Sequence, residues 1–212
     1  MGKLYFVTSN EGKILRAKEQ LSEYGIDIDW LNHDCAEPNV NDISYIAKYK
    51  VLEAYNLIHE PCFVVDSGFY IDNYPGESGF PGAFPKRAIV KTDGDLEGII
   101  DLLQKMENIN NRECRFVDCL TYYDGTQLKV FYGVTGGTLS YEKRGIPQVK
   151  AKSDLWYVFI PTGANKTLAE MTDEERNIKK DPRYISAILE FGKWYSSINP
   201  IKPSMLKLER ED

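Results

Sequence analysis

A short apolar run near the N-terminus leads directly into an amphipathic helix, and this junction most constrains how the chain can fold. Leu4–Val7 predicts a buried strand, and Thr8-Ser9-Asn10 follows it with the short polar side chains that cap helices. A helical pattern comes next, in which apolar residues recur at spacings of three and four. Those residues are Ile14, Ala17, Leu21 and Tyr24. A strand followed at once by a helix with one apolar face indicates a sheet covered by helices.

Two further helices are predicted from the same periodicity, with an apolar strand between them. One begins near Asn41 or Asp42, and the other is capped by Asp93 or Asp95. The first is expected to bury Ile43, Ile46, Ala47, Ala54 and Leu57, and the second Leu96, Ile99, Ile100 and Leu103. The strand, Cys62–Val65, is expected to end at a turn formed by Asp66-Ser67-Gly68.

The C-terminal half predicts an antiparallel strand pair and then more helix. Arg112–Thr138 contains the hairpin signal Asp124-Gly125 between two strand-forming runs. Thr172 and Glu175 have the spacing of a capping box. Asp181-Pro182 suits the start of a last helix ahead of Ile185, Ile188 and Leu189.

These elements predict an α/β fold of the mixed α+β type, with a mixed sheet and flanking helices. No repeat, low-complexity tract or linker divides the chain, so we expect a single domain over residues 1–212. Hydrophobic residues make up 42% and charged residues 27%, which is typical of a globular protein.

The net charge and the cysteines indicate which kinds of partner and which cellular compartment to expect. The net charge of −6 argues against a nucleic-acid polymer as partner, because such proteins usually present a basic face. The N-terminal apolar run is too short for a signal peptide or a membrane span, so a cytoplasmic protein is expected. Four cysteines form no C-x-x-C pair, and they are interpreted as reduced packing residues.

The turn after the first strand has the chemistry of an anion site. Backbone N–H groups at a helix start, the side chains of Thr8 and Asn10, and the ammonium of Lys13 could together hold phosphate. The motif is not a Walker loop, because Ile14 stands where that loop has Ser or Thr. A plain helix cap with a solvated lysine is the alternative.

Asp66 is the strongest candidate for chemistry, because a carboxylate at the end of a strand can hold a metal or take a proton from water. The alternative interpretation of Asp66 is structural: its side chain would accept a hydrogen bond from the amide of Gly68 in an Asx turn. A serine-hydrolase triad through Ser67 is a poor fit, since the chain has only His33 and His59. Both histidines are interpreted as surface residues, and Glu37, read alone, as a solvated acid.

Other candidates are weaker when taken singly. Gly79-Phe80-Pro81-Gly82 followed by Lys86-Arg87 could close over phosphates, and Arg176 and Arg183 could reach a ligand. Trp156 could stack on a base, although at its spacing it could equally belong to the core.

The order of these signals along the chain resembles the inosine triphosphate pyrophosphatase family. The resemblance runs from about Leu4 to Leu189. It rests on Thr8-x-Asn10-x-x-Lys13, Glu37, Val64-Val65-Asp66-Ser67-Gly68, Gly79-x-Pro81-Gly82, Gly136-Gly137, Lys166-Thr167-Leu168-Ala169-Glu170-Met171 and Glu174-Glu175-Arg176-Asn177.

The resemblance implies an elongated two-lobed fold around a long mixed sheet, usually dimeric, with a nucleotide in the cleft between the lobes. By matching position, Glu37 and Asp66 would hold Mg²⁺, and Asp66 and Lys13 would carry catalysis. The substrate-binding residues implied are Thr8, Asn10, Lys13, Ser67, Gly68, Lys86, Trp156, Arg176 and Arg183.

Three departures from the family pattern bear on function. The family's aromatic-Gly-aromatic-Asp-Pro segment is here Lys152-Ser153-Asp154-Leu155-Trp156-Tyr157, and its Ser-His-Arg is Asp181-Pro182-Arg183. Both of these departures concern segments that the family uses to recognise the base. The third departure is Val65, which stands where the family usually has an acidic residue before the catalytic Asp. This replacement affects the metal site.

The resemblance therefore implies a Mg²⁺-dependent nucleoside triphosphate pyrophosphatase. Its substrate would be a non-standard purine nucleotide such as ITP, dITP or XTP, or a nucleotide with another base. Two alternatives stay open: a pyrophosphatase for pyrimidine or modified nucleotides, like the Maf proteins, and a nucleotide-binding sensor without turnover.

Overall fold

The computed structural model describes residues 3–85, 97–146, 153–176 and 184–199. Its centre is a seven-stranded mixed sheet with the strand order β2-β1-β3-β5-β6-β7, and β4 pairs with β3 off this path. The predicted fold class is confirmed. The strands are β1 (Tyr5–Val7), β2 (Asp29–Leu31), β3 (Cys62–Ile71), β4 (Phe80–Gly82), β5 (Glu113–Tyr123), β6 (Leu128–Leu139) and β7 (Phe159–Pro161).

Strand β3 is much longer than the neighbour on its outer edge, and this leaves a stretch of edge open. β1 runs parallel to β3 but pairs with it only as far as Phe63. β4 pairs antiparallel with β3 from Phe69 onward. On the other side, β5 pairs with β3 from Cys62 to Ile71. The residues from Val65 to Gly68 therefore lie at a gap between two short edge strands.

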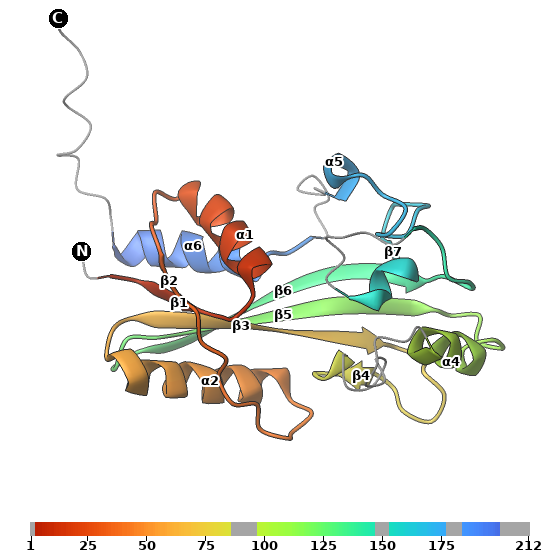
Figure 1. Ribbon diagram of the computed structural model, residues 1–212, viewed down its shortest axis with the longest axis horizontal. Coiled ribbons are helices and arrows are strands. Elements are labelled where there is room, and N and C mark those ends of the chain that lie inside the picture. Colours follow the sequence, from red (N-terminus) through yellow and green to blue (C-terminus); the bar gives the residue numbers. More distant parts are fainter. Residues whose placement is uncertain (1–2, 86–96, 147–152, 177–183, 200–212) are drawn as a thin grey trace, which may run out of the picture.

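Helices cover both faces of the sheet. α1 (Glu11–Ser22) and α6 (Ala187–Ile198) lie on one face, and α2 (Ile43–Ile58) lies on the opposite face (Figure 1). α4 (Glu97–Lys105) lies near the far end of the long strands, as do η1, a 3-10 helix (Asp154–Tyr157), and α5 (Asp173–Arg176).

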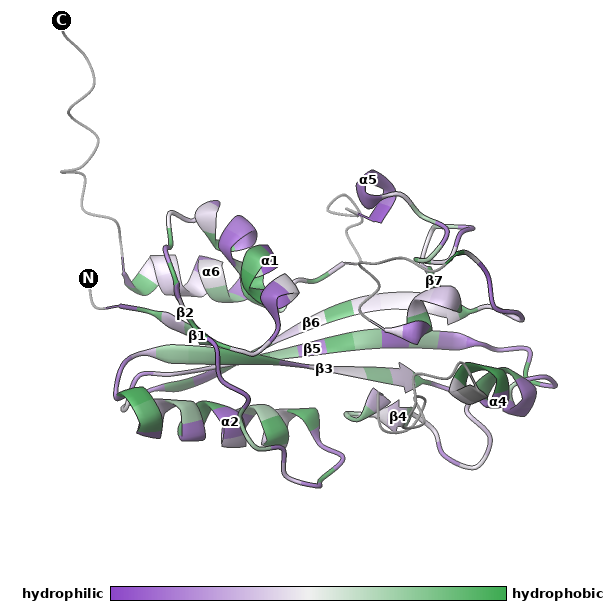
Figure 2. Ribbon diagram, in the orientation of Figure 1, coloured by the Kyte–Doolittle hydropathy of each residue, from purple (hydrophilic) through white to green (hydrophobic). Residues whose placement is uncertain are grey.

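The buried side chains form clusters along an elongated molecule. One cluster packs α1 and α6 against the sheet around Phe6, Phe63 and Phe191, and another packs α2 against its other face. A third lies at the far end, where Phe69 and Phe159 meet the helix α4. Apolar and polar residues alternate along α2 in Figure 2, as expected for a helix with one side on a sheet.

The predicted helix starts are partly correct. Oδ1 of Asn10 accepts a hydrogen bond of 3.1 Å from the amide of Lys13, and Asp42 caps α2 in the same way. The predicted start of the last helix at Asp181-Pro182 lies outside the described residues, and α6 itself begins at Ala187 with Ser186 as its cap. Ile185 instead forms an isolated bridge with Val134, so it is not part of the helix.

Two predicted helix faces needed correction. Leu57 is 55% exposed and Ile100 is 51% exposed. On α2 the buried stripe contains Val51 and Ala54 and continues to Ile58, one residue beyond Leu57. On α4 it runs through Ile99 and Leu102 and on to Met106, so Ile100 faces away from it.

The turn expected at Asp66-Ser67-Gly68 is wrong, because β3 continues through these residues to Ile71. Ladder hydrogen bonds to β5 hold them extended, and no pattern near these residues indicates that β5 pairs with them. The hairpin at Asp124-Gly125 is confirmed by the pairing of β5 with β6. The capping box is confirmed too: Thr172 and Glu175 each accept the other's backbone N–H, at 3.2 and 2.9 Å.

All four cysteines are free and buried, as expected. Within the described ranges, no helix combines the length and apolarity that crossing a membrane requires.

Candidate active site

A cavity of about 1000 Å³ opens where β3 has its free edge. Its wall includes the start of α1, the middle of β3, the inner side of α2 and residues of η1. Because the sheet edge is uncovered there, the cavity can be reached by side chains from both faces of the sheet. Among the residues implied by the family resemblance, Thr8, Asn10, Lys13, Glu37, Asp66, Ser67, Trp156 and Arg176 line it.

Lys13 lies at the bottom of this cavity. Its Nζ donates a 2.7 Å hydrogen bond to the carbonyl oxygen of Val65 on the open edge of β3. Burial lowers the pKa of Lys13, and the carboxylates of Asp66 and Asp118 oppose that shift without cancelling it. An ammonium whose charge is under-compensated favours an anionic ligand such as a phosphate.

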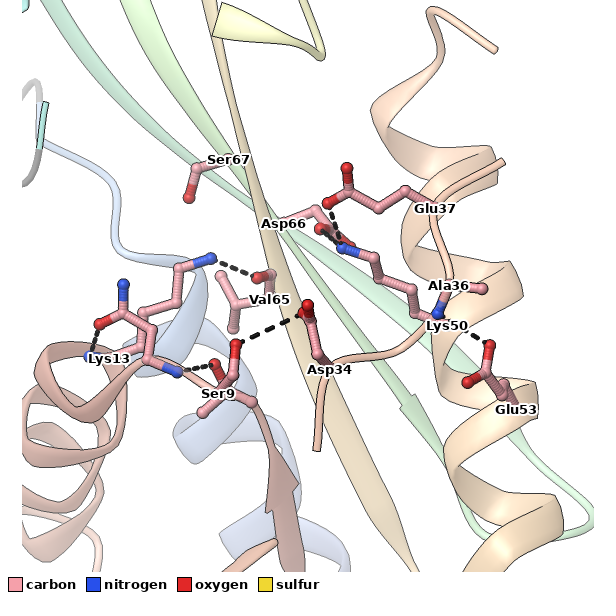
Figure 3. Close-up of polar contacts among 12 residues, drawn as sticks. Ser9, Lys13, Asp34, Ala36, Glu37, Lys50, Glu53, Val65, Asp66 and Ser67 are labelled. Atoms are coloured by element: carbon pink, nitrogen blue, oxygen red, sulfur yellow. Dashed lines mark hydrogen bonds and ion pairs between the residues drawn. The ribbon is translucent and has the colours of Figure 1, made fainter. Parts of the chain in front are cut away.

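Asp66 meets a second lysine, Lys50 of α2, from the other side of the sheet. Nζ of Lys50 lies 2.6 Å from Oδ1 of Asp66 and 2.7 Å from Oε1 of Glu37. Figure 3 shows Lys13 and Lys50 reaching β3 from opposite sides. Burial alone would lower the pKa of Lys50, but its contacts with Asp66 and Glu37 raise it overall. Lys50 is therefore a charged ammonium between two carboxylates.

The second carboxylate oxygen of Asp66, Oδ2, is buried and has no hydrogen-bond partner among the residues that the structure describes. A buried carboxylate oxygen without a donor is costly, and such atoms usually await a ligand, an ion or a water. Glu37 and Asp66 already share one cation, the ammonium of Lys50. Two carboxylates that converge on one cation, with an open oxygen on one of them, suit a hard divalent cation such as Mg²⁺.

A further carboxylate, Asp118 of β5, lies across from Ser67. Oγ of Ser67 donates to Oδ1 of Asp118 at 2.5 Å, and the two residues are directly paired between β3 and β5. Alternation along β3 puts Ser67 and Val65 on one face and Asp66 on the other. Val65 is 6% exposed and packs in the cluster under α1. Asp118 thus supplies a carboxylate on the face where Val65 has none.

Arg16 lines the cavity one helical turn after Lys13. Its Nε is buried and makes no hydrogen bond to any residue in the described ranges. Its charge contributes to lowering the pKa of Lys13, so the two cations lie close together. A buried guanidinium nitrogen without an acceptor marks a place where a ligand can supply one.

Trp156 and Arg176 form part of the opposite wall. The guanidinium carbon of Arg176 lies 5.1 Å from the ring centroid of Trp156. Arg176 also donates to the carbonyl of Leu168 at 2.9 Å and to Asp173 at 2.5 Å. Its donors are thus engaged by its own segment, and its clearest effect is to fix the indole. Tyr157 is buried in the core, whereas Trp156 faces the cavity.

The remaining predicted residues divide into three groups. Thr8 and Asn10 line the cavity, and Oγ1 of Thr8 accepts the amide of Asn10 at 3.1 Å. Gly68 is not part of the wall; a Cβ there would lie 2.9 Å from the carbonyl of Gly82, so its role here is the close approach of β4. Lys86 and Arg183 lie outside the described residues.

Sequence reasoning missed Lys50, Asp118 and Arg16, although two of them carried a signal. Lys50 falls on the buried stripe of α2, four residues before Ala54. Asp118 interrupts the inward-facing alternation of β5 between Phe116 and Leu120. Charged residues at apolar positions of a helix or strand are rarely accidental. Arg16 can be identified only from the structure, in which its Nε is buried.

The fold and the cavity define a mixed α/β protein with a cation-lined site for a nucleotide-sized anionic ligand. The sequence matches the Ham1 family over residues 4–183, and the chain belongs to that family. It is 35% identical to a dITP/XTP pyrophosphatase of Pyrococcus horikoshii, over 82% of this chain and 88% of that protein. A dITP/XTP pyrophosphatase of Thermococcus kodakarensis is 32% identical, over 91% and 96%. The resemblance drawn from the motifs is confirmed.

Solved structures share the fold. The Ham1 protein of Staphylococcus aureus superposes with a TM-score of 0.72 at 21% identity, over 92% of this chain and 99% of that one. A HAM1 protein from Coxiella burnetii gives a TM-score of 0.74 at 20% identity, over 94% and 98%.

Proposed function

We propose that this protein is a nucleoside triphosphate pyrophosphatase that hydrolyses non-standard purine nucleotides to the monophosphate and pyrophosphate. The observation that carries the proposal is the group at the open edge of β3. There, Lys13 and Lys50 lie on either side of Asp66, whose Oδ2 is buried and finds no partner in the described part of the chain. The names of the relatives, dITP/XTP pyrophosphatase, supply the substrate class.

The chain's own residues divide the work between binding and chemistry. The amides at the start of α1, with Thr8 and Asn10, present donors to the triphosphate, and Lys13 adds a cation beside them. Asp66 is the proposed acceptor of the proton from the attacking water. Lys50 holds Asp66 in place and stabilises its charge. Pyrophosphate leaves with its charge balanced by Lys13.

Glu37 and Asp66 would hold a divalent cation, proposed as Mg²⁺. When bound, it would neutralise phosphate oxygens and favour attack at the α-phosphorus. Their convergence on Lys50 supports this assignment. Strand alternation places Val65 on the face opposite Asp66, where it packs in the cluster under α1, so Val65 itself offers no ligand to such a cation.

The base would lie between Trp156 and the middle of α1. Arg16 is three residues beyond Lys13, which places it about 4.5 Å farther from the phosphate-binding helix start. An arginine at that level suits the O6 and N7 acceptors of a 6-oxopurine, which adenine lacks in part. Trp156, fixed by Arg176, offers a stacking surface.

Three further points belong to this proposal. A single domain over residues 1–212 is supported by the long strands β3, β5 and β6, which run through the whole molecule (Figure 1). The homodimer rests on the family resemblance, and the cytoplasmic location on the four free, buried cysteines. Light scattering of the purified protein tests the dimer.

The experiment that tests the reaction is hydrolysis of dITP, XTP and the common nucleotides with Mg²⁺, with pyrophosphate and orthophosphate measured separately. Pyrophosphate and monophosphate in equal amounts from 6-oxopurines support the proposal. Activity confined to pyrimidine or modified nucleotides would indicate the Maf-like alternative, and tight binding without turnover would indicate a sensor.

A further inference from the structure

A cluster of metal-ligating side chains lies outside the group formed by Glu37, Lys50 and Asp66. It consists of His33, Cys35 and Glu53, whose donor atoms all lie within 4.8 Å of one another. Nε2 of His33 is 3.3 Å from Oε1 of Glu53. In a tetrahedral zinc site with bonds of about 2.0–2.3 Å, ligand atoms are spaced by about 3.3–3.8 Å. Small side-chain adjustments would bring the three donors onto one ion.

The chain holds these residues from two elements. His33 and Cys35 are two positions apart in the segment that follows β2, and Glu53 comes from α2. The amide of Ala36 donates a 3.0 Å hydrogen bond to Oε2 of Glu53, as Figure 3 shows. This contact fixes the carboxylate and leaves Oε1 toward His33. Such outer contacts are what orient ligands at metal sites.

We propose that His33, Cys35 and Glu53 form a binding site for a thiophilic divalent cation of the Zn²⁺ class. Imidazole, thiolate and carboxylate are the donors that Zn²⁺ takes, whereas Mg²⁺ prefers oxygen donors alone. Cys35 is only 8% exposed, so its sulfur is shielded from solvent. The site shares no residue with Glu37 and Asp66, and it does not depend on the proposed hydrolysis.

The site has an open side. His33 and Cys35 both line the substrate cavity. Three protein ligands leave a fourth position on zinc, and here it would face the cavity and accept water or another donor. The competing interpretation is a His33–Glu53 hydrogen bond that happens to lie beside a buried thiol.

Cobalt titration of the full-length protein separates the two. The protein is freed of metal with a chelator, returned to excess Mg²⁺ so that hard-ion sites are filled, and titrated with Co²⁺ under reducing conditions. We expect one equivalent to bind with a thiolate-to-cobalt absorption band, and Zn²⁺ to displace it. Zn²⁺ should also raise the melting temperature, because the ligands join two elements.

Variants assign the band to these residues. Cys35→Ser should abolish it, and His33→Gln and Glu53→Gln should weaken binding at least tenfold. Cys62→Ser and His59→Gln, which change a buried thiol and a histidine outside the cluster, should leave it unchanged. If Cys35→Ser fails to fold, His33→Gln with Glu53→Gln carries the test. Absence of the band, or a band that survives these substitutions, would overturn the proposal.

Discussion

Nζ of Lys50 lies 2.6 Å from Oδ1 of Asp66, while no described residue donates a hydrogen bond to the buried Oδ2 of the same carboxylate. One oxygen is thus held by a cation and the other is left for a ligand. The arrangement depends on the short strand β1, which pairs with β3 only as far as Phe63 and leaves the following edge open.

Asp66→Asn tests the proposed base. The amide keeps the size of the side chain but accepts protons poorly, so kcat should fall by about 10²–10⁴-fold. The fold should persist, which circular dichroism checks. Normal turnover in this variant would contradict the mechanism.

Lys13→Ala tests the phosphate site. Removing the ammonium beside the open edge of β3 should lower kcat/KM for triphosphates by about 10²-fold. Inhibition by tripolyphosphate should weaken in parallel, because that anion has no base. If both values stay unchanged, the start of α1 is only a helix cap.

Arg16→Met tests base recognition. Methionine keeps the apolar stem and removes the guanidinium, so kcat/KM for dITP should fall by about tenfold relative to that for dATP. Inhibition by tripolyphosphate should change little. Lys18→Met, on the exposed side of α1, is the matched control. An equal loss for every nucleotide would assign Arg16 to phosphate binding instead.

Arg112→Leu tests a structural role away from the cavity. The buried guanidinium donates to the carbonyls of Leu139 at 2.9 Å and Ser140 at 2.8 Å, and also to that of Met106. Leaving these acceptors unpaired should lower the free energy of unfolding by about 3 kcal/mol or more. Denaturant unfolding measures this, and a change below about 1 kcal/mol would contradict it.

Sequence patterns predicted the helix caps and the hairpin of this fold, because those features depend on interactions between residues close together in the chain. Asn10 and Asp42 cap helices, and Asp124-Gly125 turns a hairpin, through contacts within a few residues. Asp66-Ser67-Gly68 resembles a turn for the same reason, yet β5, about fifty residues later, holds it extended. Pairing between strands that are far apart in the sequence is not visible in the residues around either strand.

In the candidate site, too, some residues could be predicted from local motifs and others only from the fold. Lys13 and Asp66 could be found from motifs, because each follows closely after a short apolar run that predicts a strand. The contact of Lys50 with Asp66 and Glu37 joins residues of α2, β3 and a loop, and only the fold brings them together. The pairing of Ser67 with Asp118 depends on strand register, which sequence alone leaves open.

The most direct test of the central claim is the product of dITP hydrolysis by the purified protein with Mg²⁺, resolved into pyrophosphate and orthophosphate. The proposed reaction should release one pyrophosphate for each dIMP, with little orthophosphate and a strong preference for dITP over dATP. Stepwise release of orthophosphate, or bound dITP that is never cleaved, would contradict it.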